Sequence, residues 1–385
     1  MITAGTAQVG GSDGASAARE AARRAMARAS TLHADLAIAL VTPDHRDALP
    51  AIVARVREQT HAEVVLAATV AGTMTLEGEI EDEHGVAVMV LGGELAARPF
   101  LVPSRGRSRE AGLAIGAIAA RGASLVVLFA DPVGLDPEAL LEGFAEAAPD
   151  VRVAGAGLAG DAEGALLALG DRIVSGHVAG VVFGGPGGRG RSLRADVATS
   201  EACRPLAAPR TITTVAGNAI LTIDDRPALE AFVEAASDPA LGDDPRRAAQ
   251  LVLVGLYAGE GREYLARPVV GFDPARGGLV VAGQPRAGQR IAFTVREAIG
   301  ARDDLRVRVR EGLARLGAPP AFGFYFNCVG RGSNLYGAQN VDATTLRQLL
   351  GDLPLLGCFS NFELATTAGK AEMHLFSGVA ALVAG

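Results

Sequence analysis

The chain has 385 residues, of which 49% are hydrophobic, and this is enough to build substantial cores in two or three domains. Its net charge of −7, from 36 basic and 43 acidic residues, argues against a general nucleic-acid-binding surface. Cys203, Cys328 and Cys358 are far apart in the sequence, which argues against a disulfide framework and fits a reducing compartment.

The N-terminal thirty residues lack the continuous apolar core that a secretory signal requires, so we predict no export. An apolar stretch at residues 111–130 is interrupted at residues 121–124, and the segments on either side are too short to cross a membrane. We therefore expect a cytoplasmic protein with no membrane segment.

Helical and strand-like segments alternate along the first half of the chain. A helix is expected from residue 13 onward because Ala17, Ala21 and Ala25 recur at a spacing of four. Further helices are predicted at residues 47–58, 108–120 and 136–147, and strands at 36–41, 64–70, 86–91, 124–130, 165–169 and 178–183. This alternation predicts an α+β (mixed α/β) fold, in which helices flank mixed or antiparallel sheets.

Two glycine-rich segments lie late in this half. Residues 155–160 fit the spacing GxGxxG, but no helix is predicted after them, and a dinucleotide site needs the N-terminus of that helix for the pyrophosphate. We therefore predict no nucleotide site. Residues 184–190 are predicted to form a hairpin loop or linker.

An extended crossover near residues 203–209 is the predicted domain boundary, which gives domains at 1–203 and 204–385. The second domain is predicted to begin with strands at 210–215 and 219–223 joined by a tight hairpin or a bulge, followed by a helix at 227–236 and an antiparallel meander over residues 250–294. A long amphipathic helix at 295–316 is expected to flank a sheet. Apolar strands are then expected at 322–326, 353–359 and about 373–383.

The densest polar chemistry follows the first two of these last strands. Asn327 and Cys328 end the first strand, and Arg331 lies between two glycines, where the chain turns sharply or lets a ligand approach the backbone. Asn334 and Tyr336 supply further donors and acceptors nearby. This pattern is typical of a ligand pocket, although an ordinary turn beside an inert buried thiol would also explain it.

The second strand carries Phe359 near its end and is followed by Asn361 and Glu363. Open sheets with helical crossovers place their sites at the carboxyl ends of strands, so we expect both strands to bring their polar ends to one edge.

These residues also resemble a known family. The sequence Asn-Cys-x-Gly-Arg-Gly at 327–332, followed by Leu-Tyr-Gly at 335–337 and Gly-Cys-Phe-Ser-Asn-Phe-Glu at 357–363, is similar to the C-terminal half of the FIST family, named from F-box and intracellular signal transduction proteins. The family usually has a Gly-Glu-Ile-like step after the second strand. Here Glu363 is kept but the glycine is not.

Residues 64–91 resemble the other hallmark of the family, with Gly-Glu-Ile at 78–80 between two apolar strands. The order of features in this segment is similar to that in residues 353–383, which suggests a diverged internal duplication. In that case Glu79 and Glu363 would occupy equivalent places. Each carboxylate would then either contact a ligand amine or Arg331, or cap free backbone N–H groups.

The resemblance implies a stand-alone intracellular sensor of small ligands, proposed to include amino acids, that acts in signal transduction through a separate output protein. One branch of the family is reported to bind haem and sense nitric oxide. A haem would require an axial His or Cys in an apolar pocket, for which His374, His177 and Cys328 are the candidates, although a haem-free site without any cofactor is our primary expectation.

Two further alternatives stay open. The histidines show no metal-ligand spacing, but Cys328 and His374 could form a nucleophile and base pair, which would make the protein a Cys-dependent enzyme. The second alternative is that the protein is a protein–protein adaptor. The working hypothesis is a non-enzymatic ligand-binding protein in which Arg331 binds an amino acid or other carboxylate.

Overall fold

The computed structural model describes residues 2–120, 122–160, 163–185, 193–242, 244–257, 259, 261 and 264–385. Most of the predicted glycine-rich loop at 184–190 lies outside these residues. The chain forms two compact units: unit 1 contains Met1–Ser200, Arg302–Met373 and Ser377–Gly385, and unit 2 contains Glu201–Ala301 and His374–Phe376. The chain therefore first leaves unit 1 close to the predicted boundary at residue 203, but it returns at Arg302, so the predicted second domain is divided between the two units.

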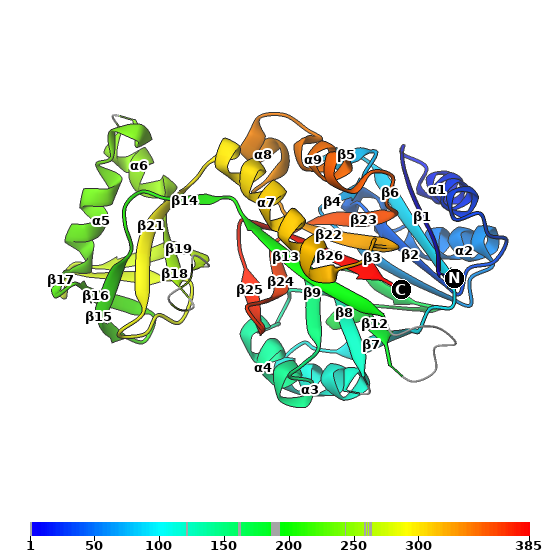
Figure 1. Cartoon of the computed structure of the whole chain (residues 1–385), viewed down its shortest axis with the longest axis horizontal. Helices are drawn as coiled ribbons and strands as arrows, with labels where there is room; N and C mark the ends of the chain where they lie inside the picture. Colours follow the sequence, from blue (N-terminus) through cyan, green and yellow to red (C-terminus); the bar gives the residue numbers. More distant parts are fainter. Residues whose placement is uncertain are drawn as a thin grey trace. The chain divides into compact units, whose positions relative to one another are not determined.

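Unit 1 is built from three repeats of one arrangement of strands and helices (Figure 1). Repeat I contains β1 (Ile2–Gly10), α1 (Gly14–Ala29), β2 (Leu36–Val41), η1 (Pro43–His45), α2 (Leu49–Thr60), β3 (Val64–Thr69), β4 (Gly72–Thr75), β5 (Gly78–Glu81) and β6 (Gly85–Gly93). Repeat II contains β7 (Ala97–Pro103), α3 (Ser108–Ala119), β8 (Ala123–Ala130), α4 (Pro137–Ala147), β9 (Arg152–Gly157), β10 (Leu167–Leu169), β11 (Arg172–Val174) and β12 (His177–Gly184).

Repeat III is interrupted by unit 2. It contains β13 (Arg194–Glu201), α7 (Ala298–Leu316), β22 (Phe322–Cys328), α8 (Gly332–Tyr336), α9 (Val341–Leu350), β23 (Leu355–Ser360), β24 (Phe362–Thr367), β25 (Lys370–His374) and β26 (Ser377–Ala384). Unit 2 is inserted between β13 and α7, at the place where β1 leads into α1 in repeat I and β7 leads into α3 in repeat II.

The three sheets have corresponding strand orders: β1-β6-β2-β3-β10-β11, β7-β12-β8-β9-β24-β25 and β13-β26-β22-β23-β4-β5. In each sheet the two strands joined by a helical crossover are parallel, as in β2 with β3, β8 with β9 and β22 with β23. The hairpin that follows crosses to another sheet, so β4 and β5 of repeat I extend the sheet of repeat III. The expected duplication is therefore a triplication with exchanged hairpins.

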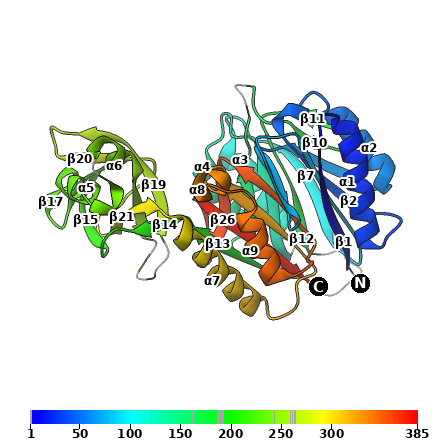
Figure 2. The same cartoon turned by 90° about the horizontal axis from the view of Figure 1, so that it is seen from above.

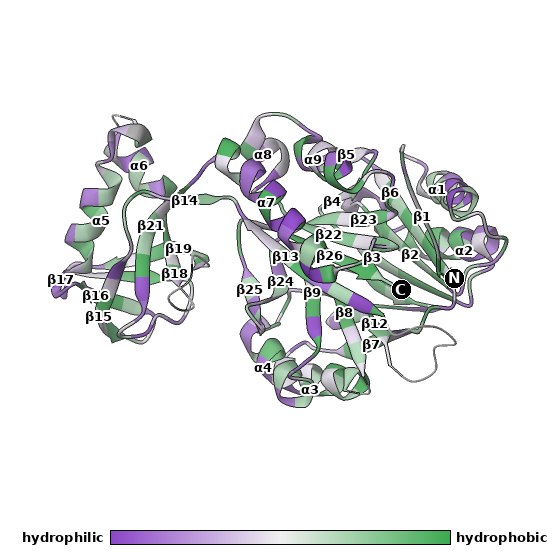
Figure 3. Cartoon of the chain, viewed as in Figure 1, coloured by the Kyte–Doolittle hydropathy of each residue, from purple (hydrophilic) through white to green (hydrophobic). Residues whose placement is uncertain are grey.

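One face of each sheet lies on a common apolar core. Phe129 of repeat II packs against Phe326 of repeat III, with ring centroids 5.8 Å apart, and Phe183 packs against Phe322 at 5.4 Å. The other faces carry helices: α1 and α2 lie side by side on the sheet of repeat I (Figure 2). In Figure 3 the central strands have hydrophobic colours, whereas α1 is divided between hydrophobic and hydrophilic residues. The predicted alanine face of α1 is buried, as expected.

Unit 2 is a small antiparallel barrel. It contains β14 (Cys203–Pro205), β15 (Arg210–Ala216), β16 (Ala219–Ile223), β17 (Arg226–Pro227), α5 (Ala228–Ala236), η2 (Pro239–Leu241), α6 (Pro245–Leu251), β18 (Val252–Tyr257), β19 (Tyr264–Asp273), β20 (Gly278–Val281) and β21 (Arg290–Arg296). The predicted meander closes on itself because β21 pairs with β15 on one edge and β18 on the other. The α+β fold class is thus confirmed.

Candidate functional site

The carboxyl ends of β22 and β23 lie side by side, as the sequence predicted. The two strands are parallel, with Asn327 opposite Phe359 and Cys328 opposite Ser360. Side chains at paired positions of a sheet point to the same face, and successive residues alternate between faces. Asn327 and Phe359 therefore share the face of Tyr325, whose ring packs with residues of α7 and α9.

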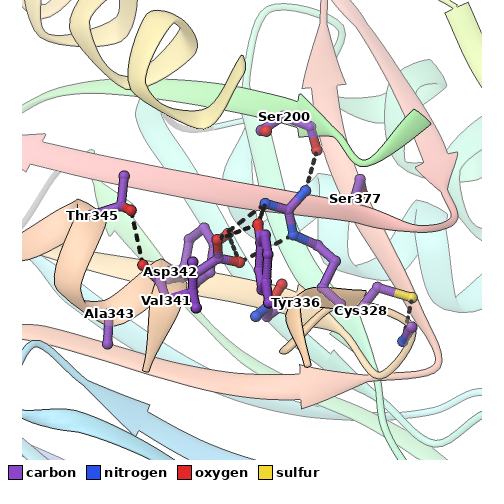
Figure 4. A network of polar contacts seen from close by, with 12 residues as sticks. Ser200, Cys328, Tyr336, Val341, Asp342, Ala343, Thr345 and Ser377 are labelled. Atoms are coloured by element: carbon purple, nitrogen blue, oxygen red, sulfur yellow. Dashed lines mark hydrogen bonds and ion pairs between the residues drawn. The ribbon is translucent and has the colours of Figure 1, made fainter. Parts of the chain in front are cut away.

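Arg331 is fully buried and paired with a carboxylate that the sequence analysis did not single out. Its Nε and Nη2 donate to the two carboxylate oxygens of Asp342 over 3.1 and 3.2 Å. Tyr325 and Tyr336 donate to the same carboxylate over 3.0 and 2.7 Å, and Figure 4 shows Tyr336 beside Asp342. We call these four residues the Arg331 cluster. Its cation and its carboxylate balance each other's charge inside the protein.

The protonation states in the cluster follow from burial and from the ion pair. Burial opposes the charge on Arg331, but the Asp342 carboxylate outweighs it and holds the Arg331 pKa well above its ordinary value. Burial, with the nearby Asp342, raises the pKa of the Tyr325 and Tyr336 hydroxyls. Both hydroxyls therefore keep their protons and act as hydrogen-bond donors to Asp342.

Arg331 also contacts the backbone of β13. Its Nη1 lies 3.5 Å from the carbonyl oxygen of Ser200, which is the residue at which the chain leaves unit 1 (Figure 4). Arg331 also donates from Nη2 to the Tyr336 hydroxyl, at 2.8 Å. Its role as the binding residue for a ligand carboxylate stays a prediction, and such a ligand would have to compete with Asp342.

Two glutamates of β5 cap the helices that surround the cluster. Glu79 accepts hydrogen bonds from the backbone N–H groups of Asn340, at 2.6 Å, and Ala343, at 2.9 Å, at the start of α9. Glu81 accepts from the N–H group of Ser333 at 3.1 Å, at the start of α8. Burial raises the pKa of Glu79 to about 7 and also raises that of Glu81. Of the two roles weighed for Glu79, the structure shows backbone capping.

Glu363 is a buried acid in a different hydrogen-bond network. Its carboxyl oxygens lie 2.9 Å from the Ser360 hydroxyl and 2.8 Å from the Ser377 hydroxyl, and burial raises its pKa to about 8. Glu363 lies on β24, the first strand of its hairpin, whereas Glu79 lies on β5, the second strand of its own. The expectation that the two glutamates are equivalent is therefore wrong.

Unlike these polar groups, the Asn327 side chain has no hydrogen-bond partner among the described residues. Its side chain is fully buried, and neither Nδ2 nor Oδ1 has a hydrogen-bond partner among the described residues. The backbone carbonyl of Asn327, by contrast, accepts from the Ser360 hydroxyl at 3.1 Å. Buried amides in native proteins are nearly always paired, so an orphan of this kind requires an explanation.

The remaining predicted site residues are at the edges of this region. Phe359 is buried, and its ring lies so close to Gly332 that a Cβ there would be 2.7 Å from Cε1. Cys328 is buried, and its Sγ accepts a long hydrogen bond of 3.4 Å from the Gly330 N–H. Asn334 is exposed and donates to the Val329 carbonyl at 2.9 Å.

Asn361 is also exposed and donates to the Leu158 carbonyl at 3.2 Å. The structure thus places Asn327, Phe359, Arg331 and Tyr336 on or next to one face of the sheet, with Asn334 and Asn361 on the surface.

Sequence reasoning missed Asp342, Tyr325 and Glu81. Strand alternation could have found two of them, because Tyr325 shares the face of Asn327 and Glu81 shares that of Glu79. Asp342 offered no such signal, since it lies in a helix beyond the loop.

The three haem-ligand candidates have separate surroundings. His177 begins β12, and its Nδ1 lies 2.7 Å from the Ser175 carbonyl oxygen. Cys328 ends β22 in another sheet. His374 belongs to unit 2, where its Nδ1 lies 3.4 Å from a Glu201 carboxylate oxygen. No contact described for these residues joins His177 to Cys328.

Together these features define a mixed α+β protein with buried polar chemistry at the ends of two parallel strands. The chain belongs to the FIST family: the FIST N domain matches residues 35–226 and the FIST C domain matches residues 228–366. FIST domains are a sensory module, and the resemblance seen in the sequence is thereby confirmed.

Two mycobacterial proteins are similar to this chain over nearly its full length. The uncharacterized protein MT0656 of Mycobacterium tuberculosis is 28% identical over 376 residues, which are 95% of each chain. The uncharacterized protein Mb0898c of Mycobacterium bovis is 30% identical over 382 residues, or 96% of each chain. Among the described residues, no helix combines the length and the apolar character that crossing a membrane requires.

Proposed function

We propose that this protein is a cytoplasmic sensor that binds a small polar molecule at the carboxyl ends of β22 and β23 and signals through a separate protein. The sensory character of FIST domains supports the general class. The proposal is for a binding protein, with no catalytic step.

The observation that carries the proposal is the orphan amide of Asn327. Leaving a buried donor and acceptor unpaired costs about 1–3 kcal/mol, and the same fold could avoid this cost with an apolar side chain of similar shape. Natural proteins keep such local conflicts mainly at functional sites. A ligand that hydrogen-bonds to Asn327 would pair the buried amide, remove this cost and explain why an asparagine occupies this position.

The neighbouring groups are suited to hold the site in shape. The Arg331 cluster fixes the loop after β22, because Arg331 and Tyr336 both bind the Asp342 carboxylate of α9. Phe359 supplies an apolar surface beside Asn327. Preorganised groups of this kind reduce the entropy that is lost on binding.

The proposal is tested by a thermal-shift screen of the purified protein against a metabolite library. A compound at about 100 times its Kd should stabilise the protein by about 2.7 kcal/mol. The shift should be lost in Asn327→Leu and retained in Asn334→Ala, which removes an exposed amide from the same stretch. A ligand that shifts all three proteins equally would place the binding site elsewhere, and the absence of any binding compound would contradict the sensor.

One observation favours the adaptor as a second candidate. In unit 2, the exposed side chains of Val270 and Phe272 on β19 accompany exposed Val233 on α5, and the Phe272 ring lies 5.3 Å from that of Phe232. Exposed apolar groups that gather in this way are typical of protein interaction sites. A signalling protein that binds wild type and loses affinity for Phe272→Ser, in the absence of any small ligand, would support the adaptor.

A further inference from the structure

The surroundings of Asn327 are rich in carboxyl groups. Arg331 is the one cation with a described contact in the Arg331 cluster, and Asp342 already holds two of its nitrogens. The β5 carboxyls of Glu79 and Glu81 lie close enough for Asp342 to contribute to the raised pKa of each. The local balance is therefore one guanidinium against three carboxyl groups. A further anion would be repelled here, and it would also have to lose its hydration.

Asn327 is connected to this group of charges through Tyr325, two residues earlier on the same face of β22. Its neighbour across the sheet is Gly378 on one side and Phe359 on the other. Tyr325, two residues earlier on the same face, donates to Asp342 and lies so close to Gly378 that a Cβ there would clash with the Tyr325 hydroxyl. The orphan amide is thus next to an apolar ring and a balanced ion pair, with no unbalanced cation described beside it.

The helix α8 begins against Phe359, which is the neighbour of Asn327 in the sheet. At its start, Gly332 has φ +52 and approaches both the Phe359 ring and the Glu81 carboxylate, and a side chain would not fit there. Ser333 is held by Glu81, and Tyr336 is held by Asp342. These contacts fix the helix α8 at both of its ends, next to the Phe359 ring.

An asparagine side chain presents one donor and one acceptor next to each other. A carboxylate can satisfy only the donor, and an ammonium only the acceptor. A carboxamide, lactam or cyclic imide carries an acceptor and a donor with the matching spacing, and it adds no charge.

Resting on the proposed function, we infer that the ligand of this site presents an uncharged, amide-like group to Asn327, so that the site selects carboxamides, lactams or imides over carboxylates. This specificity differs from the Arg331-bound carboxylate that the sequence suggested. Over a carboxylate, which satisfies only the donor, the amide-like group gains one further hydrogen bond of about 0.5–1.5 kcal/mol, which corresponds to a preference of about 2- to 13-fold.

The test uses three small probes of similar size: propionamide, propionate and propylammonium. Saturation-transfer difference NMR is recorded for the full-length wild-type chain and for Asn327→Leu, Asn327→Asp and Asn334→Leu. We expect propionamide to bind wild type and the Asn334→Leu control, and to lose at least about 10-fold in affinity in Asn327→Leu, because both hydrogen bonds are gone. In Asn327→Asp, which adds a charge, propylammonium should replace propionamide as the preferred probe.

Each other outcome overturns the inference. These outcomes are a preference for propionate, no propionamide signal in wild type, and equal propionamide binding in wild type and Asn327→Leu. The metabolite screen separates this failure from failure of the sensor: a carboxylate metabolite that depends on Asn327 would leave the proposed function standing and refute the amide specificity. If no metabolite and no probe binds, both fail.

Discussion

Replacing Asn327 by leucine should stabilise the ligand-free protein. Leucine has the same branched shape at Cγ, so it can occupy the volume of the amide without a cavity or a large displacement. Two buried polar atoms that lack partners among the described residues are removed. An unsatisfied buried group costs about 1–3 kcal/mol, so the free energy of unfolding of unit 1 should rise by about that amount.

The assay is urea unfolding followed by far-UV circular dichroism, because the chain has no Trp to serve as a fluorescent reporter. The two compact units can unfold separately, so the transition of unit 1 must be fitted on its own. Asn334→Leu, at an exposed position, is the control and should change the free energy of unfolding by no more than about 0.5 kcal/mol. The usual net value of a hydrogen bond is about 1 kcal/mol. If Asn327→Leu instead lowers the free energy of unfolding by about that amount or more, the Asn327 amide is hydrogen-bonded in the free protein.

Three other substitutions test the polar network. Asp342→Asn should lower the free energy of unfolding by about 3–5 kcal/mol because it leaves Arg331 buried without its counter-charge. The double variant Asp342→Asn, Arg331→Met should recover much of this loss. If the losses of the two single variants simply add in the double variant, the pairing is refuted. Glu363 has a pKa raised by burial from 4.5 to about 8, so its stabilising contribution is complete below pH 4.5 and is lost as the pH rises through 8. Glu363→Gln should therefore reduce the decline in urea stability between these pH values, and an unchanged decline would assign it to other groups. Glu81→Ala should lower the free energy of unfolding by about 0.5–2 kcal/mol because a helix cap is lost. The control Glu77→Ala removes an exposed ion pair with Arg28 and should lower it by at most about 1 kcal/mol. Equal losses of stability for the two variants in thermal denaturation would contradict the capping role of Glu81.

Local patterns predicted much of the fold because periodicity and capping are local properties. The alanine spacing predicted α1, and the apolar run at 36–41 predicted β2 with the same bounds. β1, β7 and β13 were missed because each mixes small, polar and apolar residues without a clear alternation. The exchange of hairpins between repeats could not be predicted, since it depends on pairings such as β4 with β23 that join distant parts of the chain.

The sequence predicted which strand ends lie together but not the contacts of the polar residues that follow them. Turn residues and strand ends correctly brought Asn327 and Phe359 together, because parallel strands align their carboxyl ends. The sequence could not show that Arg331 is already paired, because its partner Asp342 is in a separate helix. An isolated arginine between glycines predicts anion binding equally well whether the anion belongs to a ligand or to the protein itself.

Native mass spectrometry of freshly purified protein tests the central claim most directly. Wild type and Asn334→Ala should carry the same small molecule, and Asn327→Leu, expressed and purified in parallel, should be recovered without it. Retention of that molecule by Asn327→Leu at the wild-type occupancy would contradict binding through the buried amide at the end of β22.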